Sequence, residues 1–204
     1  MTAPETTTQP DFTYRWRVVD IVVAAVLSVA VGLIFYGWNT IGYAGYEAVN
    51  ALTPGLGGLV NGVWFLGGPL GAIIIRKPGA ALFVEILAAS VSAALGTVWG
   101  IEVLYSGFAQ GLGAELIFLL VIYRRFNLTL TMISGALAGV GAVVLEYFLG
   151  NIAKGLEYNL IYLATSTVSG AILAGLLAWV LMRALAKTGA LSRFAAGREA
   201  QSSI

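Results

Sequence analysis

Histidine and cysteine are both absent from this 204-residue chain. Their absence excludes Ser-His-Asp and Cys-His nucleophilic catalysis, histidine or thiolate metal sites, and disulfides. No phosphate-binding loop of the form GxxxxGK[ST] occurs in the sequence either. We therefore expect a protein that is not an enzyme and that holds no metal or other cofactor. If ATP drives its work, another chain must bind that ATP.

Charge is also scarce. Charged residues make up 10% of the chain, hydrophobic residues make up 59%, and the mean hydropathy is +0.89. Soluble domains carry about 25% charged residues, so this composition indicates a membrane protein with the lipid bilayer as its surroundings. The formal net charge of +1 gives no field that selects a polyanion, and we expect no nucleic-acid partner.

Long apolar runs, by contrast, are abundant. A membrane-spanning helix needs about 20 mostly apolar residues, and six stretches approach this length: 18–38, 56–75, 79–98, 107–123, 130–150 and 158–182. They predict an all-α, multi-pass membrane protein with a bundle of six transmembrane helices over residues 18–182. An N-terminal tail at 1–17 and a basic C-terminal tail at 183–204 flank the bundle. The C-terminal tail could be an amphipathic surface helix or a frayed end.

The positive charges are distributed unevenly between the connections. All but one of the eleven cations fall before the first stretch, after the second, after the fourth or after the sixth; they are Arg15, Arg17, Arg76, Lys77, Arg124, Arg125, Arg183, Lys187, Arg193 and Arg198. Lys154 alone lies on the other side. Because Lys and Arg concentrate in cytoplasmic loops, we expect both termini to be cytoplasmic and the protein to lie in the plasma membrane.

Polar and aromatic residues gather toward the opposite, outer ends of the helices. Trp and Tyr there could be interfacial anchors, but Asn, Gln and Glu below the surface would be costly in hydrocarbon unless they had partners. Stripes of small residues on the same helix faces predict close packing with a cavity in the outer half. The candidate substrate-binding residues are Trp38, Asn39, Asn61, Trp64, Glu85, Trp99, Gln110, Glu115, Glu146 and Tyr162.

Three carboxylates lie within the predicted spans, and such residues are functional candidates by default. We favour Glu115 for the ligand site, whereas Glu85 lies closer to the cytoplasmic turn. Glu85 could serve the site, form a cytoplasmic ion pair, or stabilise a helix N-terminus. Carboxylates among tryptophans suit a small cationic or amino-bearing heteroaromatic ligand, which stacks on Trp and donates hydrogen bonds.

The first outer connection, residues 39–55, contains Tyr43, Tyr46, Glu47 and Asn50 but no cation. Its length and its Tyr and Gly content suit a mobile lid over a site. An aromatic belt resting on the headgroups is the other interpretation.

Specific motifs also carry a resemblance. The stretch GVWFLGGPLGAIIIRKPGAALFVEILAASVSAALGTVWG, followed by GFAQGLGAELIFLLVIYRR, resembles the YkoE-type substrate-binding subunits (S components) of energy-coupling-factor (ECF) importers. The resemblance implies six helices with both termini inside. It also implies hydroxymethylpyrimidine or thiamine as substrate, and as partners a transmembrane coupling (T) subunit and two cytoplasmic ATPase subunits.

The first helix carries a further candidate. Ala24, Ser28 and Gly32 form a small-residue stripe that resembles the face with which S components dock on the coupling subunit. Ordinary packing of helices within the chain is the alternative.

Other function classes remain open at this level. An ion-coupled secondary transporter of a small cationic or heteroaromatic solute could use Glu85 and Glu115 as carriers, although no convincing inverted repeat is present. A membrane enzyme would have only carboxylate chemistry. A purely structural scaffold would leave the buried carboxylates unexplained.

Overall fold

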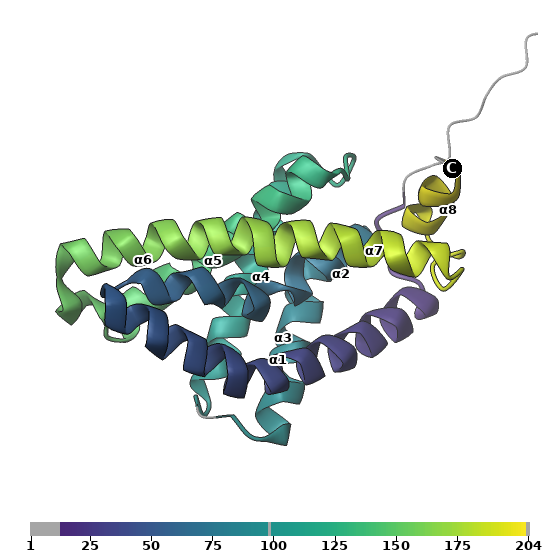
Figure 1. Ribbon diagram of the computed structural model, residues 1–204. Coiled ribbons are helices and arrows are strands. Elements are labelled where there is room, and N and C mark those ends of the chain that lie inside the picture. Colours follow the sequence, from purple (N-terminus) through teal and green to yellow (C-terminus); the bar gives the residue numbers. More distant parts are fainter. Residues whose placement is uncertain (1–12, 98, 203–204) are drawn as a thin grey trace, which may run out of the picture.

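The computed structural model describes residues 13–97 and 99–202, and every regular element in this part of the chain is helical. The prediction of an all-α protein is confirmed there. Figure 1 shows the bundle. Its elements are α1 Val18–Leu52, η1 Leu56–Phe65, α2 Gly67–Ile75, α3 Ala80–Leu95, α4 Glu102–Leu120, α5 Leu128–Leu149, η2 Asn151–Lys154, α6 Gly155–Ser169, η3 Gly170–Leu176, α7 Leu177–Lys187 and α8 Ala195–Ser202.

Each of the six apolar stretches is largely helical where the structure describes it. By length and composition, five helical segments could cross a membrane: Val18–Leu52, Leu56–Ile75, Glu102–Leu120, Leu128–Leu149 and Asn151–Lys187. The remaining helix, α3, is apolar but only 16 residues long, because Gly96 ends it at a φ of 107°. Six crossings therefore stay a prediction.

The first helix is longer than its apolar run, and the outer connection expected over residues 39–55 is helical as far as Leu52. Helix α1 continues to Leu52, and Figure 1 shows it running the length of the bundle. Its buried face explains this continuation: Phe35, Asn39 and Gly42 follow one another at helical spacing and pack inward.

The second stretch is divided into two kinds of helix. Residues Leu56–Phe65 form an unusually long 3₁₀-helix and only Gly67–Ile75 is α-helical. The amide of Gly62 donates to Ser169 Oγ at 2.8 Å, and a Cβ on Gly62 would lie 2.3 Å from the Ser169 carbonyl oxygen. Close contact with the last long helix therefore determines the path of η1, which carries several residues of the candidate site.

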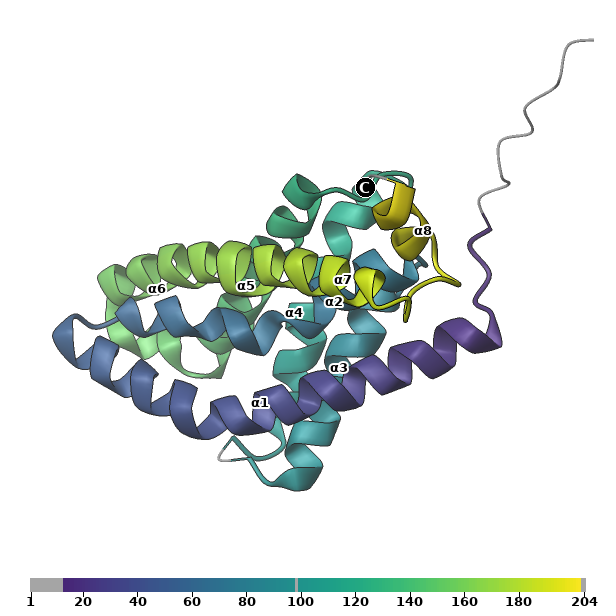
Figure 2. The same cartoon turned by 45° about the vertical axis from the view of Figure 1, so that its right-hand side comes forward.

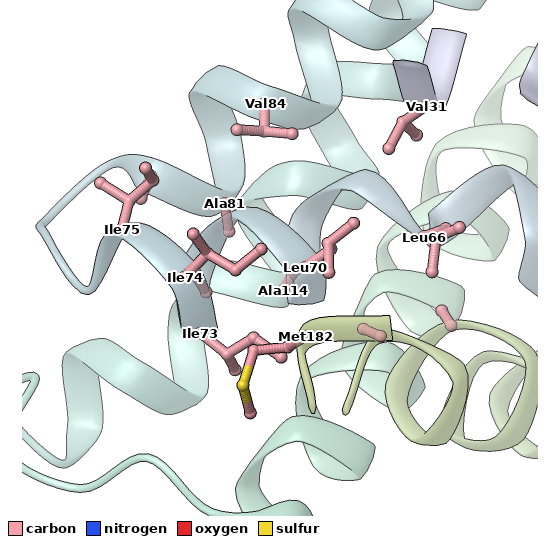
Figure 3. Close-up of a cluster of buried hydrophobic side chains, with 14 of the residues drawn as sticks. Val31, Leu66, Leu70, Ile73, Ile74, Ile75, Ala81, Val84, Ala114 and Met182 are labelled. Atoms are coloured by element: carbon pink, nitrogen blue, oxygen red, sulfur yellow. The ribbon is translucent and has the colours of Figure 1, made fainter. Parts of the chain in front are cut away.

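Helix α2 lies at the centre of the molecule, and each of its nine residues is buried. It contacts α1, α3, α4, α5, α7 and α8. Figure 3 shows its Leu70, Ile73 and Ile74 in the apolar cluster that also contains Val84 of α3 and Met182 of α7. A bundle of short, interrupted helices thus has a continuous apolar interior.

One end of the bundle brings together both terminal segments and the two cation-rich turns, and we call it the basic end. Trp16 Nε1 donates to the Pro78 carbonyl at 3.0 Å, and the Tyr14 hydroxyl donates to the Ile122 carbonyl at 3.1 Å. Arg76 forms a bidentate ion pair with Glu199 of α8, both contacts being 2.7 Å long. Figures 1 and 2 show α8 and the start of α1 at this end. The C-terminal segment contains a docked helix, and α7 runs five residues past position 182.

The small-residue stripe of α1 is used inside the chain. Ala24 and Ser28 have no exposed surface, and a Cβ on Gly32 would lie 2.6 Å from Val91 Cβ of α3. Residues that are buried within the chain present no surface to a second protein. The docking hypothesis for Ala24, Ser28 and Gly32 is therefore corrected: packing within the chain is what the structure contains.

Candidate functional site

A cavity of about 270 Å³ lies at the end of the bundle away from the basic end. Helices α1, α3, α4, α5 and α6 surround it together with η1 and η2. Its lining residues are Phe35, Asn39, Tyr46, Asn61, Trp64, Phe65, Ala89, Ser92, Trp99, Glu102, Val103, Ser106, Gln110, Leu145, Glu146, Leu149, Gly150, Asn151, Lys154 and Tyr162. This mixture of aromatic, aliphatic and a few polar groups is typical of a site for a small molecule.

Tryptophan and tyrosine rings form one wall of the cavity. Trp64 packs edge-to-face against Trp99, with ring centroids 6.3 Å apart, and Tyr46 packs in the same way against Tyr162 at 6.4 Å. Trp38 packs behind Trp64 at 6.5 Å and does not line the cavity. Flat aromatic faces at the edge of a cavity are suited to stacking with a planar ring.

Two asparagines hold the wall in place. Asn39 donates to Ser92 Oγ at 3.0 Å and accepts from Trp64 Nε1 at 2.9 Å, so it links α3 to η1. Asn61 donates to the Tyr162 hydroxyl at 2.7 Å. Both were predicted from the sequence because an unpaired amide in a membrane is costly, and each has found protein partners beside the cavity.

Three charged residues lie around the cavity. Glu102 and Glu146 come from α4 and α5, and Lys154 comes from η2. The Lys154 ammonium donates to the Tyr158 hydroxyl at 3.3 Å and lies 4.6 Å from the centroid of that ring. The lining therefore carries two carboxylates and one ammonium group, a balance that favours a neutral or positively charged ligand.

Gln110 lies between the cavity and the interior. Its hydrogen-bond partners assign the orientation of its amide: Nε2 lies 3.1 Å from the Trp64 carbonyl oxygen and 3.1 Å from Glu85 Oε1, and its oxygen accepts from Ser106 Oγ at 2.7 Å. Glu85 is fully buried behind it and accepts from the Gly68 amide at 2.5 Å. Glu85 therefore contacts the lining from behind without belonging to it.

Glu115, which the sequence analysis favoured as a ligand residue, does not line the cavity. Its carboxylate accepts hydrogen bonds from the Gly79 and Ala81 amides, at 2.7 and 2.8 Å, and from the Tyr123 hydroxyl at 2.6 Å. These partners lie at the start of α3 and beyond the end of α4, next to the basic end. Burial and the neighbouring carboxylate raise the pKa of the Tyr123 phenol, which keeps it a hydrogen-bond donor. The preference for Glu115 as a ligand residue is corrected: it stabilises a helix N-terminus.

The structure brings together most of the predicted candidates. Those that line the cavity are Asn39, Asn61, Trp64, Trp99, Gln110, Glu146 and Tyr162, whereas Trp38, Glu85 and Glu115 do not. Glu102, Ser106 and Lys154 also line the cavity, although they were not among the site residues predicted from the sequence. A signal for the first two was present, because Glu102, Ser106 and Gln110 follow one another at four-residue spacing on α4 and so share a helix face.

Comparisons with known proteins show what this chain is similar to. Residues 19–141 match the family described as "ABC-type cobalt transport system, permease component". The chain is 36% identical over 187 residues to the "Putative HMP/thiamine permease protein YkoE" of Bacillus subtilis, covering 90% of this chain and 92% of that protein. Its structure is similar to a solved one described as "Crystal structure of an S-component of ECF transporter", with a TM-score of 0.85, 33% identity, and coverage of 93% of this chain and 95% of that one.

Proposed function

Because this chain belongs to the family of YkoE-type S components of ECF transporters, we propose that it is the substrate-binding subunit of an importer for hydroxymethylpyrimidine or thiamine. The resemblance in the sequence motifs is thereby confirmed at the level of the family. The named relative is described as a permease for HMP and thiamine, and we assign the same substrate class to this chain.

The observation that carries the proposal is the cavity with Trp64 and Trp99 beside the carboxylates of Glu102 and Glu146. A pyrimidine ring offers a planar face for stacking and polar edges for hydrogen bonding. Thiamine adds a positively charged ring, which suits aromatic faces and carboxylates. The cavity of about 270 Å³ lies at the small end of the range usual for small-molecule sites, which suits a small ligand.

Transport needs partners that the chain does not supply. The sequence contains no phosphate-binding loop, so in this proposal two cytoplasmic ATPase subunits drive uptake and a transmembrane T subunit couples them to this chain. The basic end faces the cytoplasm and the cavity faces the outside, as the distribution of Lys and Arg predicts.

The family description mentions cobalt, and a metal cargo is the natural competitor. The sequence has no His and no Cys, and the described residues include no group of three or more Asp or Glu residues placed to hold a metal ion. The donor set is therefore poor for a transition metal, which favours imidazole and thiolate ligands. An aromatic-lined cavity favours an organic ligand instead.

Tryptophan fluorescence of the purified full-length chain tests the substrate. It is titrated separately with hydroxymethylpyrimidine, thiamine and riboflavin. We expect saturable quenching by one or both of the first two and none by riboflavin. A folded sample that responds to neither pyrimidine compound would overturn the proposed substrate class. Uptake into vesicles that contain this chain alone, driven by a proton gradient, would instead indicate an ion-coupled secondary transporter.

A further inference from the structure

We propose that Glu85 is a positioning residue: it holds Gln110 so that the cavity receives a hydrogen-bond acceptor. The consequence is selectivity for a ring that carries an amino group over the same ring with an oxo group. The inference rests on the function proposed above and specifies which edge of the substrate the site reads.

The amide of Gln110 has two N–H donors and one oxygen. The Trp64 carbonyl oxygen lies 3.1 Å from the amide nitrogen and takes one N–H. Glu85 Oε1, also 3.1 Å away, takes the second N–H. Both donors are therefore used inside the protein. What remains for a ligand is the amide oxygen, whose second lone pair is free beside the hydrogen bond from Ser106.

Glu85 is held rigidly in this role. Its side chain has no exposed surface, and its Oε2 accepts from the Gly68 amide at the start of α2. Gly67 and Gly111 lie close to this side chain: a Cβ on Gly67 would lie 2.8 Å from Glu85 Oε2, and one on Gly111 would lie 3.1 Å from Glu85 Cβ. It does not line the cavity, and so it acts on a ligand only through Gln110.

The neighbouring polar groups also offer the ligand hydrogen-bond acceptors rather than donors. Asn61 directs its amide nitrogen to Tyr162 and Ser166, at 2.7 and 3.2 Å, which leaves its oxygen as an acceptor. Glu102 and Glu146 add carboxylate oxygens to the lining. An amino group can donate to such oxygens, whereas an oxo group would face them without a partner. A buried polar atom left unpaired in this way weakens binding strongly.

The test compares two ligands on the full-length chain in detergent: the aminopyrimidine hydroxymethylpyrimidine and its oxo counterpart, with dissociation constants from calorimetry. We expect the wild type to bind the amino ring tighter by about tenfold or more. In Glu85→Gln, an amide nitrogen that faces Gln110 would oppose its present orientation, which only the Trp64 carbonyl would then favour. This variant should lower the preference by about tenfold. Gln110→Met, which keeps the side-chain length and removes the amide, should do the same.

Glu115→Gln is the matched control, because Glu115 is also a buried carboxylate at a helix N-terminus but lies off the cavity. It should leave the ratio of the two affinities unchanged. Equal binding of both rings by the wild type would overturn the inference and leave the proposed function intact. An unchanged ratio in folded Glu85→Gln would overturn the role of Glu85. If neither ring binds the wild type, the proposed function fails and this inference fails with it.

Discussion

Glu85 of α3 and Glu115 of α4 each accept hydrogen bonds from backbone amides at the N-terminus of the preceding helix. Glu85 receives the Gly68 amide of α2 at 2.5 Å, and Glu115 receives the Gly79 and Ala81 amides at the start of α3. The first amides of a helix have no partner within the helix, and a carboxylate there also interacts favourably with the helix dipole. Two acidic residues that look alike in the sequence thus have the same structural task, but only Glu85 lies next to the cavity lining.

We expect Glu115→Ala to destabilise the protein by about 3 kcal/mol, because it leaves several donors without an acceptor. Tyr123→Phe removes only one of these hydrogen bonds and should cost about 1 kcal/mol. Thermal unfolding in detergent measures both. Ligand affinity of the folded fraction should not change. A large loss of affinity in Glu115→Ala, with stability unaltered, would return Glu115 to the ligand site.

The two tryptophans that flank Trp64 offer a matched pair. Trp99 and Trp38 pack against it with similar geometry, at 6.3 and 6.5 Å, but only Trp99 lines the cavity. We expect Trp99→Ala to weaken hydroxymethylpyrimidine or thiamine binding by about ten- to a hundredfold through lost stacking. Trp38→Ala should weaken it by less than about threefold. Equal effects of the two variants would argue against stacking on Trp99.

Because α5 and η3 approach closely at Gly135, adding a single methyl group there should strongly reduce the stability of the fold. A Cβ on Gly135 would lie 2.1 Å from the Gly170 carbonyl oxygen, whereas a Cβ on Gly37 of α1 would meet nothing within 4 Å. Gly135→Ala should destabilise the fold by about 1–3 kcal/mol or prevent its assembly. Gly37→Ala should stabilise it by up to about 1 kcal/mol, because alanine is the better helix former. Unfolding midpoints of the two variants provide the comparison.

The ion pair between Arg76 and Glu199 predicts how firmly α8 is held. Arg76 is nearly buried, but the Glu199 side chain is 63% exposed, so solvent screens the pair and its contribution is at most about 1 kcal/mol. Glu199→Gln should leave global stability almost unchanged and increase tryptic cleavage at Arg193 and Arg198. Raising the salt concentration should have the same effect on the wild type. Protection that persists in the variant would show that Leu191 and Phe194, both buried, hold the segment without the ion pair.

The absence of cysteine makes the predicted orientation directly testable. Single cysteines at Ile152 and Ser192, both exposed, lie at opposite ends of the bundle. In intact cells, a membrane-impermeant maleimide should label Ile152→Cys and label Ser192→Cys only after the cells are permeabilised. The reverse pattern would place the basic end outside and contradict the interpretation of the cation distribution.

Much of this architecture could be predicted because it follows from local composition. Apolar runs located the helices, and amides placed among apolar residues predicted Asn39 and Asn61 beside the cavity. Two features depended on contacts distant in sequence. The 3₁₀ path of η1 follows from Gly62 pressing on Ser169, and no local pattern shows it. The second is the role of Glu115. Ile122 and Tyr123 both have a φ of 52°, and this turn of the backbone after α4 brings the Tyr123 hydroxyl within hydrogen-bond distance of the Glu115 carboxylate.

The burial of α2 has a mechanical consequence. A helix with no side chain facing lipid, held on its sides by α1, α3, α4, α5 and α7, cannot slide or tilt unless all its neighbours repack. It begins at Gly67, two residues after the cavity-lining Phe65, and ends next to Arg76 at the basic end, so it connects the two ends of the bundle. Rocking of one half of the molecule against the other would have to disrupt the packing of α2 against these helices.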